Sequence, residues 1–458
     1  MSTIEAYLAS HLGETIRDIE AFCAIPSVST DPAYGDGVAA AADFVAERLG
    51  AAGFPKVEIV KTEGHPAVLA EWCETAGAPT ILVYGHYDVQ PPDPLDLWVT
   101  PPFEPTIRDG RLYARGASDD KGPLMIPIAV AAAFRAVAGG LPLNLKMLIE
   151  GEEESGSPNF EPTVARLKHR LRCDLVVSAD GAMWRADLPS VTVASRGLVA
   201  LEVIVHGAGR DLHSGRHGGS APNPIRALAR MLASLHDAHG NVEVAGFYDA
   251  ALPSDPAILA AIAEVGFNTG AYYDEIGAAR PTPLPTGDNL LRRQWLAPTL
   301  EFNGISGGYA GPGTKTVIPA SASAKISCRL VAGQDPDAVV HAIEGHLERV
   351  LPSGYRIELQ RHGAGSVAYA LDPATPALGL AEDILEALLG ARPLRVAMGA
   401  TIPIGTVFRQ HLGVETIFFS FSTSDEDYHA PNEFFRLSSL QTGLIAWSRL
   451  FERLGAGE

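Results

Sequence analysis

Apolar residues recur every three to four positions near the amino terminus, at Ile4, Leu8, Leu12, Ile16 and Ile19. This spacing predicts a helix over residues 3–22, and a similar pattern predicts a second helix over 37–52. Short apolar runs predict strands near 56–61, 66–72 and 79–84. The proline-rich stretch 91–105 is expected to form an irregular loop, and 122–137 a long apolar helix.

The pattern changes character after about residue 195. Residues 198–206 alternate like a half-exposed strand, and the following elements are a helix at 222–236, strands at 299–305 and 321–331, a helix at 336–350 and a strand at 355–361. This β-α-β-β-α-β order is that of a ferredoxin-like domain. An insertion over about 240–297, with a helix near 255–265, interrupts it.

Helical spacing returns at 374–390 and 403–412, followed by a strand at 414–421 and a final amphipathic helix at 434–453. We therefore expect two domains, a larger α/β domain built from 1–194 and 371–458, and a smaller α+β domain, 195–370, inserted into it. A chain of 458 residues exceeds the length at which single cores usually stop growing.

Four of the predicted strands end in acidic residues or histidine. The strand 79–84 runs into His86 and Asp88, residues 145–149 run into the acidic segment 150–154, residues 175–178 precede Asp180, and 416–421 precede His429. In open α/β sheets the functional crevice lies outside the carboxyl ends of the strands, so these side chains are expected to converge.

The converging set offers nitrogen and oxygen ligands and no thiolate. Its members are His86, Asp88, Asp119, Glu153, Glu154, Asp180 and His429. Such ligands suit zinc, manganese or cobalt. Two divalent ions sharing one carboxylate would relieve the mutual repulsion of the acids and lower the pKa of a bridging water, leaving a further carboxylate as general base.

Each residue also has an ordinary structural interpretation. Asp119 could cap the helix at 122–137, residues 150–154 could form a solvated acidic loop, Asp180 could belong to a turn, and His429 could be a surface histidine. The joint placement of all of them at strand ends of one domain favours the metal site.

Composition narrows the possible partners. The net charge of −19 disfavours nucleic acid and anionic membranes. Four widely separated cysteines without a C-x-x-C pair indicate reduced, mostly buried thiols. The amino terminus lacks a secretory pattern and no run approaches the ~18 apolar residues of a membrane span, so the expected location is the cytoplasm.

Three motifs resemble the co-catalytic dinuclear-zinc peptidases. They are Tyr84-Gly85-His86-Tyr87-Asp88-Val89-Gln90-Pro91, Gly116-Ala117-Ser118-Asp119-Asp120-Lys121-Gly122 and Glu153-Glu154-Ser155-Gly156-Ser157. The resemblance runs from Ile25 to His429 and is strongest to cytosolic nonspecific dipeptidases and carnosinases, with glutamate carboxypeptidases and aminoacylases as more distant relatives. It implies a zinc-peptidase-like catalytic α/β domain with an inserted ferredoxin-like α+β domain that serves as lid and dimerisation module.

The resemblance also implies roles for individual residues. His86, Asp119 and Asp180 would hold one metal ion, and Asp119, Glu154 and His429 the other, with Asp119 bridging. Asp88 would orient His86, and Glu153 would take a proton from the bridging water and pass it to the leaving amine. A cis peptide is expected after the bridging residue, between Asp119 and Asp120.

In the smaller domain, the segment Asp211-Leu212-His213-Ser214-Gly215 resembles one whose histidine reaches the partner subunit's active site and stabilises the oxyanion. Arg329 and Thr316 match substrate-binding positions, and a guanidinium suits a substrate carboxylate. His362 is a further expected contact. The alternatives are a loop histidine at a helix start for His213 and an exposed ion-pairing side chain for Arg329.

One segment departs from the family pattern. Where dipeptidases usually show Glu-Gly-Gly-Ser-Ile-Pro, this chain has Met398-Gly399-Ala400-Thr401-Ile402-Pro403. Gly399 and Thr401 remain candidate substrate contacts. Met398 replaces the glutamate, which leaves open how a free substrate amino group is recognised.

The sequence thus leads to the hypothesis of a homodimeric metal-dependent hydrolase that cleaves the amide bond of dipeptides or similar small peptides. It would use two divalent ions per subunit, zinc first, with manganese or cobalt as alternatives. A second hypothesis is an N-acyl-amino-acid deacylase or carbamoylase on the same scaffold. A third, an inactive peptide-binding relative, is disfavoured by the complete ligand set.

Overall fold

The computed structural model describes residues 2–457, apart from the side chain of Ala364. The chain divides into two compact units. The larger unit comprises 1–193, 371–396 and 407–458, and the smaller unit comprises 194–370 and 397–406. Compared with the predicted boundaries, the segment 397–406 lies in the smaller unit, where Arg196 and Arg329 bond to Gly399 and Thr401.

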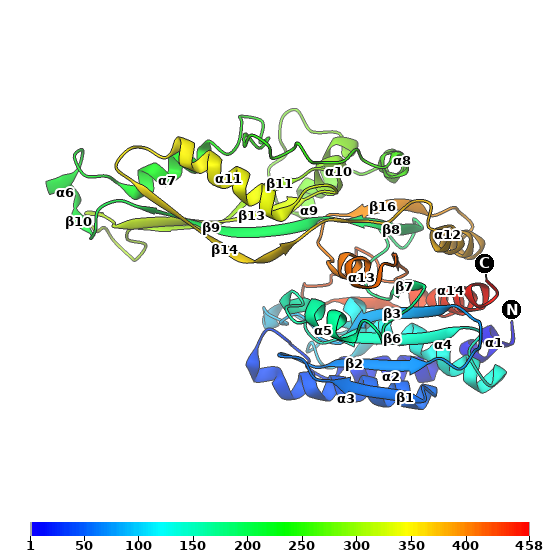
Figure 1. The fold of residues 1–458 in the computed structure, drawn as a ribbon. Helices are drawn as coiled ribbons and strands as arrows, with labels where there is room; N and C mark the ends of the chain where they lie inside the picture. Colours follow the sequence, from blue (N-terminus) through cyan, green and yellow to red (C-terminus); the bar gives the residue numbers. More distant parts are fainter. Residues whose placement is uncertain (1, 458) are drawn as a thin grey trace. The chain divides into compact units, whose positions relative to one another are not determined.

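A six-stranded sheet in the order β1-β2-β6-β3-β7-β17 forms the centre of the larger unit (Figure 1). Its strands are β1 (Lys56–Val60), β2 (Ala67–Trp72), β3 (Thr80–His86), β6 (Asn144–Glu150), β7 (Leu175–Ser178) and β17 (Thr416–Phe418). The last four run parallel to one another. Their carboxyl ends therefore lie at one edge of the sheet, as the sequence pattern predicted.

Helices cover both faces of this sheet. The helices that lie at least partly in the larger unit are α1 (Thr3–Ser10), α2 (Leu12–Cys23), α3 (Gly35–Ala52), α4 (Gly122–Ala138), α5 (Phe160–Leu167), α12 (Pro376–Leu389), α13 (Ile404–Leu412) and α14 (Leu437–Gly455). Successive residues of a strand point to opposite faces. Thus Gly85 of β3 faces Leu124 of α4, while Tyr84 packs edge-on against Phe160 of α5.

Glycine at position 85 is required by this packing. A Cβ atom there would lie 2.7 Å from the carboxylate of Asp120 and 3.0 Å from Leu124. Helix α4 can therefore approach β3 closely, which brings the segment before α4 next to the end of the strand.

The smaller unit contains a four-stranded antiparallel sheet in the order β11-β13-β9-β14. Its strands are β9 (Gly197–His206), β11 (Thr299–Gly307), β13 (Ser321–Leu330) and β14 (Arg356–Ser366), and helices α7 (Pro224–Ala233) and α11 (Pro336–Val350) complete the ferredoxin-like order. Alternate residues of β9, namely Val199, Leu201, Val203 and Val205, are buried in a core shared with α7 and α11.

The remaining elements are short or belong to the insertion. They are β4 (Thr106–Arg108), β5 (Arg111–Tyr113), β8 (Ser190–Ser195), β10 (Leu212–His213), α6 (Ser214–His217), α8 (Pro256–Val265), α9 (Thr269–Glu275), α10 (Gly287–Trp295), β12 (Val317–Ile318), β15 (Tyr369–Ala370), β16 (Leu394–Met398), β18 (Phe434–Arg436) and the single turns η1 (Pro32–Tyr34), η2 (Leu95–Leu97), η3 (Ala117–Lys121) and η4 (Glu153–Ser155).

The structure corrects several predicted elements. The helix expected over 3–22 is broken at His11, which caps α1 and stacks on Tyr7. The final helix begins at Leu437 because 434–436 form β18, paired with β5. Strands β8 and β16 were not predicted, since two-residue to six-residue strands carry too few positions for a clear period.

No run of about 18 apolar residues was expected, and one helix nevertheless passes a looser test of length and mean hydropathy, which a buried core helix also passes. Residues 117–138, which form η3 and α4, meet both criteria, and 67% of their most apolar stretch is buried. Within the larger unit α4 packs against α1, α3 and α14.

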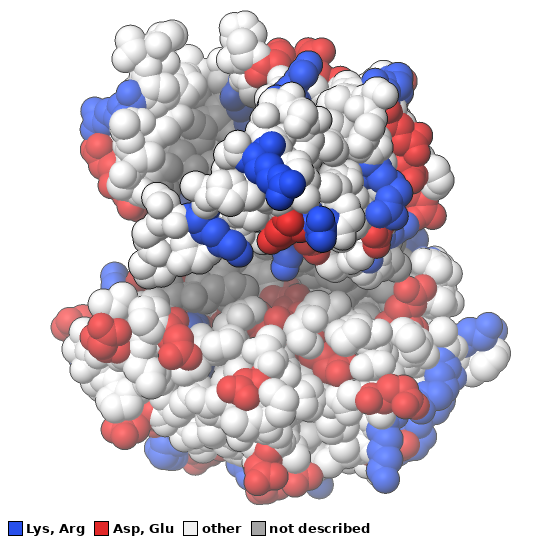
Figure 2. Space-filling model, turned by 90° about the vertical axis from the view of Figure 1, so that its left-hand side faces the viewer, with Lys and Arg blue, Asp and Glu red and all other residues white. Residues whose placement is uncertain are grey.

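On the face shown in Figure 2, acidic and basic side chains are interspersed, with neither gathered into one broad patch.

Candidate metal centre

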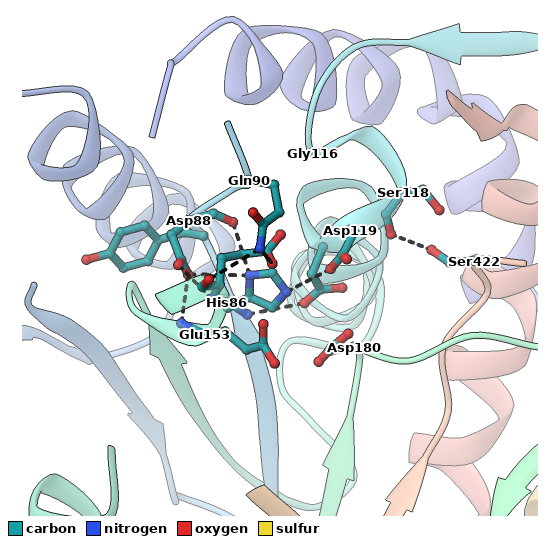
Figure 3. Close-up of polar contacts among 12 residues, drawn as sticks. His86, Asp88, Gln90, Gly116, Ser118, Asp119, Glu153, Asp180 and Ser422 are labelled. Atoms are coloured by element: carbon teal, nitrogen blue, oxygen red, sulfur yellow. Dashed lines mark hydrogen bonds and ion pairs between the residues drawn. The ribbon is translucent and has the colours of Figure 1, made fainter. Parts of the chain in front are cut away.

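The carboxyl ends of β3 and β7, together with the η3 turn, bring three ligand side chains together. His86, Asp119 and Asp180 each offer one atom, and these atoms lie within 4.8 Å of one another. The Nε2 atom of His86 lies 2.9 Å from Oδ1 of Asp119. His86 is fully buried and Asp180 is 8% exposed, so this group is shielded from bulk water within the larger unit. Figure 3 shows the three side chains pointing toward one another.

A second ligand group shares Asp119. Asp119, Glu154 and His429 also place one ligand atom each within 4.8 Å of one another. The Nε2 atom of His429 lies 3.0 Å from Oδ2 of Asp119 and 3.2 Å from Oε2 of Glu154. Asp119 therefore directs Oδ1 to the first group and Oδ2 to the second. That is the arrangement a bridging carboxylate needs.

The segment around Asp119 has an unusual backbone. Gly116 has φ of +81°, and the peptide between Asp119 and Asp120 is cis, as expected from the resemblance. Asp119 itself has extended φ and ψ angles inside an otherwise helical turn, η3. The side chain consequently projects toward the ligand groups, and the N-cap interpretation has no support, because no side chain caps α4.

Asp88 contacts the site through both its backbone and its carboxylate. Its carbonyl oxygen accepts a hydrogen bond from Nδ1 of His86 at 3.1 Å. The carboxylate accepts from the backbone N–H groups of Glu153, at 3.2 Å, and Glu154, at 3.0 Å. Asp88 thus fixes the orientation of His86 and holds the η4 turn that presents both glutamates (Figure 3).

The charges of the site are mutually repulsive. Burial raises the pKa of Glu154 to about 7 and that of Asp180 to about 6, and the Asp119 carboxylate adds to both increases. Hydrogen bonds to Asp119 and Glu154 raise the pKa of His429 to about 10. Ionising Glu154 and Asp180 is thus made harder by burial and by the neighbouring Asp119 carboxylate.

Divalent cations fit this donor set. Two imidazole nitrogens and several carboxylate oxygens, with one carboxylate facing both groups, match the ligands of nitrogen-and-oxygen metal sites. Cations would also remove the repulsion that raises the pKa of Glu154 and Asp180. The described residues therefore provide two candidate metal positions that share Asp119.

Glu153 lies beside both groups without belonging to either. Burial raises its pKa well above the usual range, and repulsion from Asp180, Glu154 and Asp119 adds to the rise while His86 opposes it. A carboxyl group with a raised pKa is suited to accept and return a proton near neutral pH.

A second cluster lies in the smaller unit. Arg329 donates to the hydroxyl of Thr401 at 2.7 Å, and Nε of Arg196 donates to the carbonyl of Gly399, also at 2.7 Å. Burial lowers the pKa of Arg196 to about 10, and the charge of Arg329 acts in the same direction. The exposed ion-pairing alternative for Arg329 has no support, because the side chain is half-buried and bonded to a hydroxyl.

The other predicted residues of the smaller unit lie apart from this cluster. His213 is exposed at the end of β10, where its Nδ1 accepts from Gly215 N–H, and Ser214 N–H donates to the carbonyl of Thr316. His362 is exposed on β14, with Nε2 at 3.8 Å from Glu202. Within this unit the structure brings Arg329 and Thr401 together and leaves His213 with Thr316 elsewhere.

Sequence reasoning missed residues that support the site. Gln90 donates to Oε2 of Glu154 at 2.8 Å. Glu433 accepts from the backbone of residues 116, 118 and 119, and Arg196 holds the segment around Gly399. Gln90 belongs to the motif at residues 84–91, which could have pointed to it. The sequence pattern around Glu433 and Arg196 does not distinguish a buried supporting residue from one on the surface.

The fold and the site together define a metal-dependent hydrolase. A model of the peptidase family M20/M25/M40 matches residues 82–453. The chain belongs to this family, which confirms the resemblance found in the sequence.

The similar proteins include dipeptidases. A Beta-Ala-His dipeptidase from Mus musculus is 32% identical over 375 residues, covering 80% of this chain and 75% of the relative. A Cys-Gly metallodipeptidase from Candida albicans is 30% identical over 452 residues, covering 93% and 92%. The solved structure of an M20 family metallo-carboxypeptidase from Sulfolobus solfataricus has a TM-score of 0.86 at 28% identity, covering 97% and 99%. These relatives do not favour the deacylase alternative.

Proposed function

We propose that this protein is a dipeptidase that hydrolyses the amide bond of short peptides with a free carboxylate. The observation that carries this proposal is the pair of ligand groups sharing Asp119, with Glu153 beside both. Relatives at 30% and 32% identity that are named dipeptidases support the substrate class.

We assign the metal ligands to the two groups that the structure assembles. His86, Asp119 and Asp180 would hold one ion, and Asp119, Glu154 and His429 the other. Zinc is the first candidate, with manganese and cobalt as alternatives, since imidazole and carboxylate ligands serve all three. When bound, the ions supply an activated water and polarise the substrate carbonyl.

The chain's own groups would then handle the proton and the charges. Glu153 accepts the proton of the attacking water and delivers it to the leaving amine nitrogen. The carboxylate of Asp88 keeps Glu153 in place by accepting a hydrogen bond from the backbone N–H of Glu153. Arg329 binds the substrate carboxylate with Thr401 beside it, and Gly399 lets this segment lie close to Gln294, since a Cβ would be 2.9 Å from that carbonyl. Thr316 and His362 are further proposed contacts.

His213 would stabilise the oxyanion. Backbone N–H groups only donate, so the bond from Gly215 requires an unprotonated Nδ1 on His213. The neutral ring then carries its proton on Nε2, which is free to donate to a negatively charged oxygen.

The position of His213 supports a homodimer. His213 pairs with Val317, whereas Arg329 lies near the far end of β13. Because a strand rises about 3.3 Å per residue, the steps from Ser321 to Arg329 span about 26 Å, too far for one dipeptide to contact both residues. Ser321 pairs with His206 at one end of β9 and Arg329 with Leu198 near the other end, and Figure 1 shows β10 at one end of β9. We infer that His213 of a second copy completes each site.

A cytoplasmic location also belongs to this proposal. All four cysteines are free, with Cys23 and Cys328 buried and Cys73 exposed. An exposed free thiol without a disulfide partner suits a reducing compartment. Sedimentation of the purified protein tests the homodimer, and cell fractionation tests the location.

The test of function is hydrolysis of a substrate panel by metal-stripped protein reconstituted with zinc, manganese or cobalt. Free dipeptides, dipeptide amides, and N-acetyl- and N-carbamoyl-amino acids form the panel. Metal-dependent cleavage of free dipeptides supports the proposal, and activity restricted to acylated substrates would overturn it. A Glu153→Gln variant that binds both ions should lose several orders of magnitude in kcat.

A further inference from the structure

The larger unit has a cavity away from the metal ligands. Its volume is about 570 Å³, and four basic side chains line it, Lys168, His169, Arg172 and His411. The first three follow α5 on the connection to β7, and His411 lies in the last turn of α13. Residues from two separate parts of the chain thus bring basic groups to one concave surface.

Most of these basic groups are available to a ligand. Lys168, His169 and Arg172 are exposed, and among residues 2–457 no hydrogen bond or ion pair engages their side chains. His411 alone has an acidic partner, Glu161, at 3.1 Å. The like charges of Lys168 and Arg172 at this shared cavity repel one another, and a bound anion would relieve that repulsion.

The carboxylate that lines the cavity, that of Asp174, already accepts a hydrogen bond from the backbone. Oδ2 of Asp174 accepts a hydrogen bond from the backbone N–H of Thr80 at 2.8 Å, and Asp174 N–H donates to the carbonyl of Thr80 at 2.8 Å. This reciprocal pair joins the first residue of β3 to the residue before β7. Asp174 therefore bonds to the backbone of Thr80 and does not pair with the basic side chains around it.

A buried cation supports the connection between α5 and β7. Lys146 is 8% exposed, and its Nζ donates to the carbonyls of Arg170 and Arg172, the latter at 2.7 Å. Lys146 thus satisfies two backbone oxygens of the connection that carries Lys168 and Arg172. Lys146 shapes the connection that presents Lys168 and Arg172, so the basic surface rests on a buried support.

The cavity is separate from the metal centre. Thr80 begins β3 and His86 ends it, so the two sites lie at opposite ends of this strand, about 20 Å apart at 3.3 Å per residue. The chain as a whole carries a charge of −19. A local excess of unpaired cations on such a chain is a specific feature and not a consequence of composition.

We propose that this cavity binds a small phosphate-bearing anion. A phosphate group presents several acceptor oxygens in different directions, which matches donors arriving from an arginine fork, a lysine and histidines on different sides. A single carboxylate could satisfy fewer of them. The cavity is larger than one phosphate group, so the remainder of the ligand would lie over Thr80 and Leu412. This inference does not depend on the proposed peptidase activity.

The test is calorimetric titration of the metal-loaded enzyme with inorganic phosphate at constant ionic strength. Phosphate can also contact a metal centre, so the comparison rests on variants. The Lys168→Gln/Arg172→Gln double variant should bind one phosphate fewer, or bind it at least tenfold more weakly, and lose the phosphate-dependent rise in Tm. The Arg210→Gln/Lys325→Gln variant makes the same change in net charge on the smaller unit and should behave like wild type.

Hydrolysis measured without phosphate should be unchanged in both double variants, because neither touches the proposed catalytic groups. Equal phosphate binding by the wild type and the Lys168/Arg172 variant would overturn the proposal, and so would an equal loss in the control, which would indicate a general charge effect. If the double variant does not fold, the Arg172→Gln single variant should still show at least a tenfold weaker phosphate affinity, and unchanged affinity there would equally overturn it.

Discussion

Glu433 holds the backbone of Asp119 from behind the metal ligands. One carboxylate oxygen of Glu433 accepts from the N–H groups of Ser118, at 2.9 Å, and Asp119, at 3.1 Å, and the other accepts from Gly116 N–H and Arg115, both at 2.8 Å. Glu433 is 1% exposed. The carboxylate of Asp119, the proposed bridge between the two metal positions, is therefore positioned by a residue 314 positions away in the sequence.

Replacing Glu433 with glutamine tests this support. The amide keeps the shape of the side chain, but its NH₂ group faces donors and loses at least one hydrogen bond. Because groups that orient a ligand tune the metal site, we expect metal affinity to fall about 10- to 100-fold. Competition with a chelating dye measures that affinity independently of turnover.

A matched control is Glu382→Gln. Glu382 is also a buried glutamate of the larger unit, 2% exposed, and it bonds to Arg392 and Arg395 on the α12 side. Replacing the Glu382 carboxylate should reduce the stability of the protein without changing its metal affinity. Wild-type affinity in Glu433→Gln, or equal losses in both variants, would contradict the positioning role.

Asp88 offers a second test, directed at the η4 turn that carries the proposed base Glu153 and the proposed ligand Glu154. Its carboxylate accepts the N–H groups of Glu153 and Glu154. In Asp88→Asn one of these donors faces an NH₂ group, so η4 shifts and Glu153 moves relative to the reacting water. We expect kcat to fall about 100-fold with little change in KM, measured by steady-state hydrolysis at saturating metal. A rise in KM at unchanged kcat would contradict this role.

Much of the metal site could be predicted because its residues carry local signals. His86, Glu153 and Asp180 each follow an apolar strand, and parallel strands share one edge. The pattern could not show the second carboxylate contact of Asp88, or which oxygen of Asp119 faces which group. Those relationships depend on the turn geometry of η3 and η4, which has no periodicity.

Supporting residues were out of reach for a different reason. Glu433 and Arg196 act through long-range contacts, and a buried charged residue has no local pattern that separates it from a surface one. The extra strands β8 and β16 were missed because six and five residues are too few to show a clear period. The fold of the smaller unit was recovered because its strands alternate clearly, as in β9.

The amino terminus provides a pH-dependent prediction. Glu5 bonds to Ser2 in a capping box, and Arg449 of α14 donates to it at 2.9 Å. Burial would raise the pKa of Glu5, but the bonds to Arg449 and Ser2 outweigh it and lower the pKa. A lowered carboxyl pKa contributes stability above the unfolded value and loses it as pH falls through the folded value.

We therefore expect Arg449→Gln to reduce the free energy of unfolding at pH 7 by less than about 1 kcal/mol, since the pair is partly exposed. The difference between variant and wild type should shrink as pH falls below about 4. Urea unfolding followed by circular dichroism at pH 7 and pH 3.5 measures this. A difference that stays constant with pH would indicate lost packing of the arginine stem.

The substrate carboxylate gives the last prediction. Arg329 is half-buried, and among residues 2–457 its side chain donates to the Thr401 hydroxyl, so the guanidinium has donors left for an anion. Arg329→Gln removes the charge but keeps a donor. We expect KM for a free dipeptide to rise about 10- to 100-fold, the loss of roughly one charge-assisted hydrogen-bond pair, with a smaller change in kcat.

The decisive comparison is between a dipeptide and its C-terminal amide. The wild type should strongly prefer the free carboxylate, whereas the variant should hydrolyse both with similar kcat/KM. The exposed Arg356 of β14 supplies the control, and Arg356→Gln should keep the wild-type preference. If Arg329→Gln also keeps the preference for the free carboxylate, another group binds that carboxylate. Arg196, which holds Gly399 in the same segment, then becomes the next residue to replace.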